Sequence, residues 1–530
     1  MKKLLFLAIA ALVFAQCDTD ELHNLNINPQ AVNQIDLNFM FTPALLSIAS
    51  NGGSGDNRYT DWRTNIGLCA YAIQQMATIS NISPGERYTE NAETNDAPFD
   101  FAYRDQLKNI AEILKQTGKG GYDEGNKVNM RNAARILRAF TYARLVDFYG
   151  NVPYTEANKG TEGLFFPKYD DGKVIYADIL KELDEAATGM STANPDQGFA
   201  KADFVYKGDI AKWKKFAYSL MLRHAMRASG ADATLAATYV AKAVAGGVMT
   251  SNADNFVIPM ALTPSQWNNQ NGISRAFNPG DGGQPAYLSK TMVDFLKGKD
   301  PSTAADDDPR LFIIGGGIQN WSASSYTVTV SDPLKQKGMP NGQDGTSLDI
   351  LEGKKVDLNA EYTKMNWLLT QFDEPYMILN VGEVELLLAE AKLKNIGAGG
   401  ISGTDKSHYE AGVKAAMQMY TIYDPTLTVS DAAVATYLTT YSYGTYKPAI
   451  EMIADQLWVS KFLNWWDAWG DFRRLDFPKL VPTKHNSSIT NGVIPTRLHY
   501  PSGERARNPN VATQGTKPDD LVTRVWWDVK

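Results

Sequence analysis

The chain has 530 residues, of which 44% are hydrophobic and 21% are charged, and its net charge is −7. This length and composition are ordinary for a folded protein with one large domain or a few smaller ones. The negative charge and the lack of basic runs argue against a nucleic-acid-binding protein, because neutralising phosphates requires a concentrated Lys/Arg surface. The 2 cysteines exclude a disulfide framework, and the 5 histidines form no HxxxH or HExxH motif. We therefore predict no metal site built from these residue types.

The first 16 residues have a basic start and a short apolar stretch, which ends at Cys17. This pattern is typical of a secretory signal peptide and is too short to span a bilayer as a mature helix. Cys17 resembles the lipid-modified cysteine of bacterial lipoproteins, although Gln16 stands where a small residue is usual. An ordinary signal peptide that contains a cysteine is the alternative. We predict a lipoprotein-type signal peptide at 1–16, lipidation at Cys17 and a lipid-anchored tether at 17–24.

Five segments further along the chain have the residue pattern of helices. Apolar residues recur at i, i+3, i+4 and i+7 in 132–150, 208–229 and 381–394, and 174–187 and 409–420 also read as helices. Small residues alternate with large ones on these faces, which favours close helix packing of the kind found in tetratricopeptide pairs. These segments therefore predict a helical scaffold.

Long polar stretches rich in Gly, Asn and Ser separate the helical segments, at 51–65, 78–98, 251–285, 300–350 and 482–520. Loops of this length in a compact domain are usually functional or irregularly folded. The alternating stretch SYTVTV predicts a strand within one of them. We expect a mainly α fold, with a tetratricopeptide-like helical scaffold, long loop insertions and a few short strands.

Several motifs occur in one order along nearly the whole mature chain. They are LNINPQAVNQIDLNFMFTPALLS (25–47), ARILRAFTYARLVDFYGNVPYTEA (134–157), GDIAKWKKFAYSLMLRHAMR (208–227), DDDPRL (306–311), WDAWGDFRRLDFP (466–478) and RVWWD (524–528). Together they resemble the SusD/RagB family of outer-membrane lipoproteins of Bacteroidetes. The resemblance implies a single SusD-like domain over 25–530.

The resemblance also implies a function. Proteins of this family have no enzyme activity, and they cover a SusC-like TonB-dependent transporter to which they deliver a captured oligosaccharide or, for some members, a peptide. We therefore expect a lipid-anchored protein on the outer membrane that faces the cell exterior, with no cofactor and no nucleic-acid partner. The alternatives are a peptide-binding RagB-type member and a structural surface lipoprotein that binds no ligand.

Aromatic side chains in the polar loops are the candidates for ligand binding. A shallow sugar site needs flat aromatic faces for the apolar side of a pyranose and polar side chains for its hydroxyl groups. The candidates are Tyr59, Trp62, Tyr88, Trp267, Asn268, Asn269, Trp321 and Tyr326. The alternative for Tyr59 and Trp62 is that they cap the scaffold, and for Trp321 and Tyr326 that they cover a pair of strands.

Two acidic stretches, 169–172 and 306–308, contain the carboxylates that calcium prefers. Neither has the spacing of an EF-hand loop, and we expect both to form exposed turns. A structural calcium ion remains the alternative.

The stretch DQLWVSKFLNWWDAWGDFRRLDFP (455–478) is rich in tryptophan. Its residues Trp458, Phe462, Trp465 and Trp469 have the spacing i, i+4, i+7 and i+11, which predicts one buried stripe on one helix. We expect the neighbouring charged residues Asp467, Asp471, Arg473 and Arg474 to form ion pairs that fix the helix end. A glycoside hydrolase, which needs two carboxylates across a sugar, is the enzymatic alternative, with Asp467 and Asp471 as its pair. We predict no catalytic residue.

Overall fold

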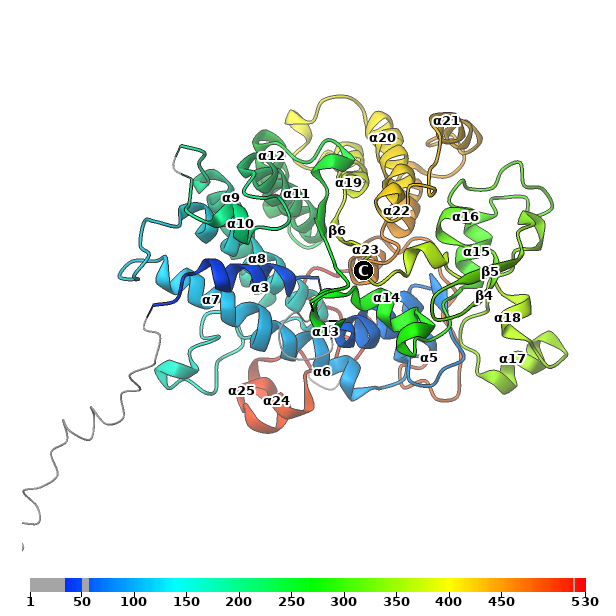
Figure 1. The fold of residues 1–530 in the computed structure, drawn as a ribbon, viewed down its shortest axis with the longest axis horizontal. Helices are drawn as coiled ribbons and strands as arrows, with labels where there is room; N and C mark the ends of the chain where they lie inside the picture. Colours follow the sequence, from blue (N-terminus) through cyan, green and yellow to red (C-terminus); the bar gives the residue numbers. More distant parts are fainter. Residues whose placement is uncertain (1–33, 50–56, 194, 265, 518–519) are drawn as a thin grey trace, which may run out of the picture.

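The computed structural model of the chain describes residues 34–49, 57–193, 195–264, 266–517 and 520–530. The predicted signal peptide, Cys17 and the tether lie outside these residues. The described part is mainly helical with a few short strands, as the sequence predicts (Figure 1).

Helices run through the whole described part of the chain. The longer ones are α3 (Asn38–Leu46), α6 (Ala92–Phe101), α7 (Leu107–Gln116), α8 (Val128–Tyr149), α9 (Gly172–Gly189), α11 (Ile210–Ala228), α12 (Ala233–Gly246), α17 (Gly345–Glu352), α19 (Val381–Leu393), α20 (Asp405–Gln418), α21 (Asp431–Thr440), α22 (Ala449–Ser460) and α23 (Trp465–Leu475). The shorter ones are α4 (Arg58–Thr60), α5 (Pro84–Arg87), α10 (Phe199–Ala202), α13 (Gln266–Asn269), α14 (Gly272–Phe277), α15 (Lys290–Leu296), α16 (Leu311–Ile314), α18 (Leu358–Glu361), α24 (Ser502–Arg507) and α25 (Asn510–Gln514), with π-helical segments η1 (Asp61–Ala70) and η2 (Ala102–Gln106).

The five segments predicted as helices coincide with α8, α9, α11, α19 and α20. In α11, Trp213, Phe216 and Leu220 are fully buried, as their helical spacing predicts. The Asp209 side chain accepts a hydrogen bond from Lys212 N at 3.1 Å and so caps the first turn of this helix. The amphipathic pattern therefore decides where these helices form and which face is buried.

Helices that follow one another in the chain pack in pairs. Helix α8 packs on α9, α11 on α12, and α19 on α20, while contacts of α11 with α9 and α19 join the pairs. Glycines allow the closest approach: a Cβ on Gly382 would lie 2.9 Å from Ala416 Cβ, and one on Gly412 would lie 2.8 Å from Leu386 Cγ. This arrangement confirms the predicted tetratricopeptide-like scaffold.

The strands of the described residues form three separate antiparallel pairs, in keeping with the few short strands predicted. They are β1 (Met76–Ala77) with β3 (Tyr287–Leu288), β2 (Phe256–Ile258) with β6 (Tyr376–Leu379), and β4 (Ile318–Trp321) with β5 (Tyr326–Val330). The last pair is a hairpin whose second strand is the predicted SYTVTV segment. The stretches expected to be long loops also contain short helices, among them η1, α6, α14 and α24.

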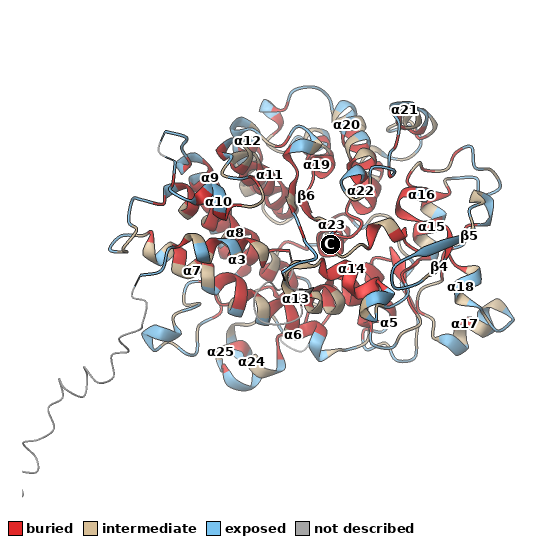
Figure 2. Ribbon diagram, viewed as in Figure 1, coloured by how far each residue is buried: buried red, intermediate tan, exposed pale blue. Residues whose placement is uncertain are grey.

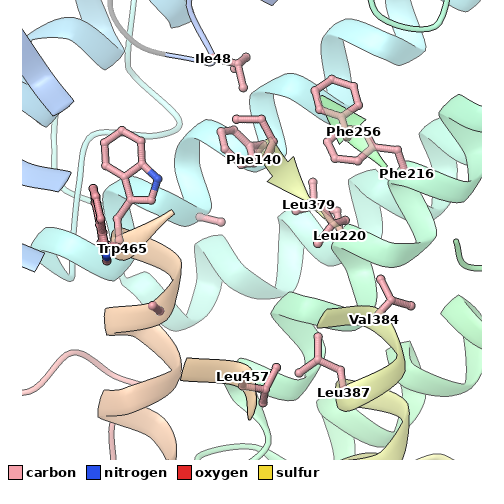
Figure 3. Close-up of a cluster of buried hydrophobic side chains, with 14 of the residues drawn as sticks. Ile48, Phe140, Phe216, Leu220, Phe256, Leu379, Val384, Leu387, Leu457 and Trp465 are labelled. Atoms are coloured by element: carbon pink, nitrogen blue, oxygen red, sulfur yellow. The ribbon is translucent and has the colours of Figure 1, made fainter. Parts of the chain in front are cut away.

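The scaffold has a continuous apolar core. Figure 2 shows buried residues along the inner faces of the helices and exposed residues on the β4–β5 hairpin and α17. Figure 3 shows the centre of the core, where Phe216 and Leu220 of α11, Leu387 of α19, and Trp465 of α23 point into one cluster. Strand β6 contributes Leu379 to the same cluster.

The tryptophan-rich stretch forms two helices, so the prediction of one helix with one stripe is wrong. Helix α22 ends at Ser460 and α23 begins at Trp465. Leu463, between them, has a φ of 78°, a left-handed conformation that interrupts a right-handed helix. Trp458, Phe462, Trp465 and Trp469 are nevertheless all buried, as expected, because the two helices pack on each other and on the scaffold.

The charged residues of α23 belong to a buried ionic network. Arg223 Nη1 lies 3.1 Å from Asp467 Oδ2, and Arg227 Nη2 lies 3.4 Å from Asp467 Oδ1. Lys461 forms an ion pair with Asp471. The predicted ion pairing is therefore present for Asp467, Asp471 and Arg474, with most partners on other helices. Within the described residues Arg473 forms no ion pair and instead donates to the backbone oxygens of Asp147 and Thr496 at 2.8 and 2.6 Å. Buried cations pair with both carboxylates, so Asp467 and Asp471 are not the open pair that a glycoside hydrolase uses.

Candidate ligand-binding surface

The first part of the candidate site is formed by α4 and η1. Trp62 is half-buried, and the Arg63 and Arg58 guanidinium carbons lie 4.0 and 5.8 Å from its ring centroid. Tyr59 packs edge-on against Phe101, with their ring centroids 5.9 Å apart, and burial raises its pKa. Cations near an aromatic face hold the ring in place by electrostatic attraction. This part of the surface therefore presents rings whose orientation is fixed.

The second part is the β4–β5 hairpin. Trp321 and Tyr326 are direct partners in the antiparallel register, so both side chains lie on one face. Beneath them is Trp367, which is 3% exposed; its ring centroid lies 5.2 Å from that of Trp321 and 6.1 Å from that of Tyr326. Trp321 Nε1 donates a hydrogen bond to Gln319 Oε1 at 2.6 Å. Trp321 is half-buried and Tyr326 is 38% exposed, so this cluster is open to solvent.

Residues 270–281 connect the two parts. Arg58 Nη1 donates to Asp281 O at 2.9 Å and lies 3.1 Å from Asp281 Oδ2. The tip of the hairpin lies against the same turn, because a Cβ on Gly280 would stand 3.0 Å from Ala323 O. Figure 1 shows α14 between α13 and the hairpin. The fold thus brings together aromatic residues about 260 positions apart in the sequence, and we call this region, with Trp62, Trp321 and Tyr326, the aromatic surface.

Helix α13 supplies polar side chains beside this region. Asn268 and Asn269 are half-exposed. Asn57 Nδ2 donates to Gln270 O, and this bond ties α13 to the start of α4. The side chain of Trp267 lies outside the described part of the structure, so its role stays a prediction.

Tyr88 does not fit the prediction that it contacts ligand. Its side chain is 0% exposed, and its hydroxyl oxygen accepts a hydrogen bond from Thr483 N at 3.1 Å. Its carbonyl oxygen also accepts from Ile489 N at 3.0 Å. The segment around Thr483 covers the polar stretch that contains Tyr88, and only the tertiary structure reveals this cover. Tyr88 is therefore excluded from the aromatic surface.

Three residues of this region were not among the sequence candidates. Trp367 supports the hairpin, Asp281 holds Arg58, and Lys364 Nζ lies 5.8 Å from the centroid of the Trp321 ring. Burial lowers the pKa of Lys364 to about 8, and its ammonium group donates to Gln319 O at 2.6 Å. Trp367 lies in an apolar run, MNWLL, that resembles core sequence, so no local signal distinguishes it.

The acidic stretches are not arranged for metal binding. Within the described residues, no group of three or more His, Cys, Asp or Glu side chains is placed to hold a metal ion. The expectation of an exposed turn at 306–308 is wrong, because Asp306 and Asp308 are buried. Asp308 instead accepts hydrogen bonds from Arg310 Nε at 2.9 Å and from Arg310 Nη2 at 2.7 Å.

Comparison with known families identifies the chain. A SusD-like family model, described as starch-binding and associating with the outer membrane, matches residues 29–501. The chain belongs to the SusD-like family. None of the curated proteins matches it. Within the described residues of this SusD-like protein, every helix is too short or too polar to cross a membrane.

Solved structures share the fold. A chitin-binding protein is 27% identical, with a TM-score of 0.76, and the match covers 93% of this chain and all of that one (100%). A SusD-like protein of Bacteroidetes is 24% identical, with a TM-score of 0.78 and coverage of 94% and 100%. A chitin-binding SusD homologue from Flavobacterium johnsoniae is 22% identical, with a TM-score of 0.70 and coverage of 93% and 99%.

Proposed function

We propose that this SusD-like protein captures a neutral oligosaccharide on the aromatic surface. The observation that carries the proposal is the pair Trp321 and Tyr326, held on one face of an exposed hairpin by the buried ring of Trp367. Aromatic rings fixed in this way offer apolar faces to the C–H side of a sugar at little cost in side-chain entropy. The chitin-binding protein at 27% identity and the starch-binding description of the family support a glycan as the ligand.

Polar groups around these rings suit the hydroxyl groups of a sugar. Arg58 and Asp281 lie between η1 and the hairpin, and Asn268 and Asn269 lie beside them, all at least partly exposed. Together they supply both donors and acceptors, which a ligand needs when its hydroxyl groups leave water. A mixture of charges of both signs favours a neutral glycan over a strongly acidic or basic one.

We further propose that the protein acts without catalysis, anchored by a lipid on Cys17 to the exterior of the outer membrane, and delivers its ligand to a SusC-like transporter. Membership of a family that associates with the outer membrane supports this location. The apolar stretch that ends at Cys17 supports the anchor. Co-purification of a TonB-dependent transporter with the protein from native membranes tests the partnership, and its absence in gently solubilised membranes counts against it.

Calorimetry with a panel of soluble chitin, starch and mannan oligosaccharides, and of peptides, tests the ligand class. We expect at least one neutral oligosaccharide to bind and Trp321→Ala to weaken that binding. Binding of peptides alone favours the RagB-type alternative. Binding of no panel member, in a folded sample, favours a structural lipoprotein. Release of reducing ends from any glycan contradicts the proposal that the protein is not an enzyme.

A further inference from the structure

A small pocket that shares no residue with the aromatic surface lies between α20, α21, α22 and the end of α15. It has a volume of about 140 Å³ and is lined by four tyrosines. Tyr409, Tyr437 and Tyr441 are buried, and Tyr446, which is 40% exposed, stands at the mouth. We call this cavity the tyrosine pocket. A cavity of about 150 Å³ is large enough to hold benzene, so the pocket has room for the body of one six-membered ring whose substituents reach the mouth at Tyr446.

The tyrosine rings that line the pocket pack against one another. The ring centroids of Tyr437 and Tyr441 are 4.8 Å apart at an interplanar angle of 41°, and those of Tyr441 and Tyr446 are 4.9 Å apart at 74°. Tyr441 is fixed by a hydrogen bond from its hydroxyl group to Asp306 O at 2.7 Å. These contacts fix the orientation of the rings that line the pocket.

A buried carboxylate in the pocket has an unused acceptor. Asp455 is 4% exposed, and its Oδ2 accepts from Lys447 Nζ at 2.7 Å. Its Oδ1 has no hydrogen-bond partner within the described part of the chain. Native proteins seldom leave a buried carboxylate oxygen without a donor, because its desolvation is then uncompensated. Burial raises the pKa of Asp455 to about 6 despite the nearby Lys447 ammonium group.

The pocket also contains a hydroxyl group that can donate. Tyr437 Oη accepts from Gln456 Nε2 at 2.8 Å, which leaves its own hydrogen for another acceptor. The Gln456 side chain is itself held by Arg310, whose Nη2 donates to Gln456 Oε1 at 2.9 Å. Tyr437 and Asp455, which both line the pocket, therefore each carry a polar group with unused hydrogen-bonding capacity.

We infer that the tyrosine pocket binds one neutral, polyhydroxylated ring, such as a single monosaccharide unit. Hydroxyl groups both donate and accept, so they match the free Oδ1 of Asp455 and the hydrogen of Tyr437 together. A cationic amine would meet Lys447, and an anion would meet Asp455, within the same small space. The inference rests on the proposed function only for the class of ligand, since the pocket shares no residue with the aromatic surface.

Met452 lines the pocket and provides a reporter. In a full-length sample labelled with 13C at the methionine methyl groups, the Met452 signal is assigned from its absence in Met452→Leu. We expect this signal to shift when glucose, galactose, mannose or N-acetylglucosamine is added at millimolar concentration. Ethanolamine and glucuronate serve as the cationic and anionic probes, and a shift with these alone would falsify the assignment to a neutral ring.

Two conservative variants test the polar groups. Tyr437→Phe removes the donor and Asp455→Asn removes the charge from the acceptor, and each is expected to weaken sugar binding about tenfold. Trp321→Ala, on the aromatic surface, is expected to leave the Met452 shift unchanged. Thermal unfolding of both variants confirms that they fold. If either variant unfolds, Tyr446→Ala at the exposed mouth replaces it, with the same expected loss.

The two proposals fail in different ways. Oligosaccharide binding that depends on Trp321, with no Met452 shift for any of the four sugars, overturns the tyrosine-pocket inference and leaves the proposed function standing. A Met452 shift that Tyr437→Phe weakens, with no oligosaccharide binding that depends on Trp321, supports the pocket and overturns the aromatic surface as the capture site.

Discussion

Two regions of this protein are rich in tryptophan and arginine, yet they differ in what surrounds them. In α22 and α23, the indole N–H groups of Trp458, Trp465 and Trp469 donate to Ile73 O, Gln75 Oε1 and Pro495 O at 3.0, 2.9 and 3.0 Å. These partners come from distant parts of the chain and enclose the rings. On the hairpin, Trp321 donates only two residues away, to Gln319. The same residue types therefore form core where other segments cover them and surface where they are left open.

The charges follow the same division. Burial alone would raise the pKa of Asp467, but Arg223 and Arg227 outweigh it and hold this pKa well below its ordinary value. Arg58 and Asp281, on the aromatic surface, form a partly exposed pair that solvent screens, and Asp281 also pairs with the buried Arg275 at 2.8 Å. The buried ion pairs therefore belong to the core, whereas the pair of Arg58 and Asp281 lies on the proposed ligand-binding surface.

Loss of a buried ring should have the largest effect. Trp469→Ala is expected to lower the free energy of unfolding by about 3–5 kcal/mol, since it removes a fully buried ring and leaves a cavity. Tyr326→Ala, on the exposed hairpin, should cost about 1 kcal/mol or less. Urea unfolding measures both. Equal losses in the two variants would show that the two regions do not differ as core and surface.

Loss of a buried charge should have the second-largest effect on the free energy of unfolding. Asp467→Asn is expected to cost about 3 kcal/mol, because it leaves the Arg223 and Arg227 guanidinium groups underpaired in the interior. Asp476→Asn is the matched control: Asp476 is exposed just after the same helix, and Asn tolerates its φ of 61°. The free energy of unfolding of this control should lie within about 0.5 kcal/mol of the wild-type value. A similar cost for both variants contradicts a structural role for the buried network.

Acid should weaken the same network. Burial acts to raise the pKa of Asp471, but Lys461 and Arg474 outweigh it and lower this pKa to about 2, whereas an unfolded aspartate titrates near 3.8. A depressed folded-state pKa stabilises the protein above the unfolded value, and that stabilisation is lost as the pH falls from about 4 to about 2. Asp471 alone should account for a loss of about 2 kcal/mol in the free energy of unfolding over this pH range. Urea unfolding across this range tests it, and an equally steep loss in Asp471→Asn argues against this assignment.

The smallest expected effect is on binding. Trp321→Ala should reduce affinity for the captured oligosaccharide about tenfold, or by roughly 1.4 kcal/mol, while leaving the fold intact. Tyr326→Phe keeps the aromatic face and loses only an exposed hydroxyl group, so its affinity should match that of the wild type. Calorimetry distinguishes the two. Unchanged affinity in Trp321→Ala removes the hairpin from the proposed site.

Much of the fold was predictable from the sequence. The spacing of Phe216 and Leu220, for example, identified α11 and its buried face, because a helix of 3.6 residues per turn places such residues on one side. The ordered motifs likewise identified the family that the match over 29–501 confirms. Sequence did not predict the break at Leu463, because the apolar spacing typical of a helix continues through this residue. The ion pair between Lys461 and the buried Glu383, beside the break, is visible only in the tertiary structure.

The candidate site shows which features cannot be predicted from the local sequence. Tyr59, Trp62, Trp321 and Tyr326 were chosen for their polar neighbours, and so was Tyr88, which is buried. Sequence alone determined the helical scaffold, the family and the kinds of side chain that can meet a ligand, since these depend on periodicity and residue type. Only the tertiary structure decided which rings stay open, because exposure depends on whether a segment hundreds of residues away packs on top.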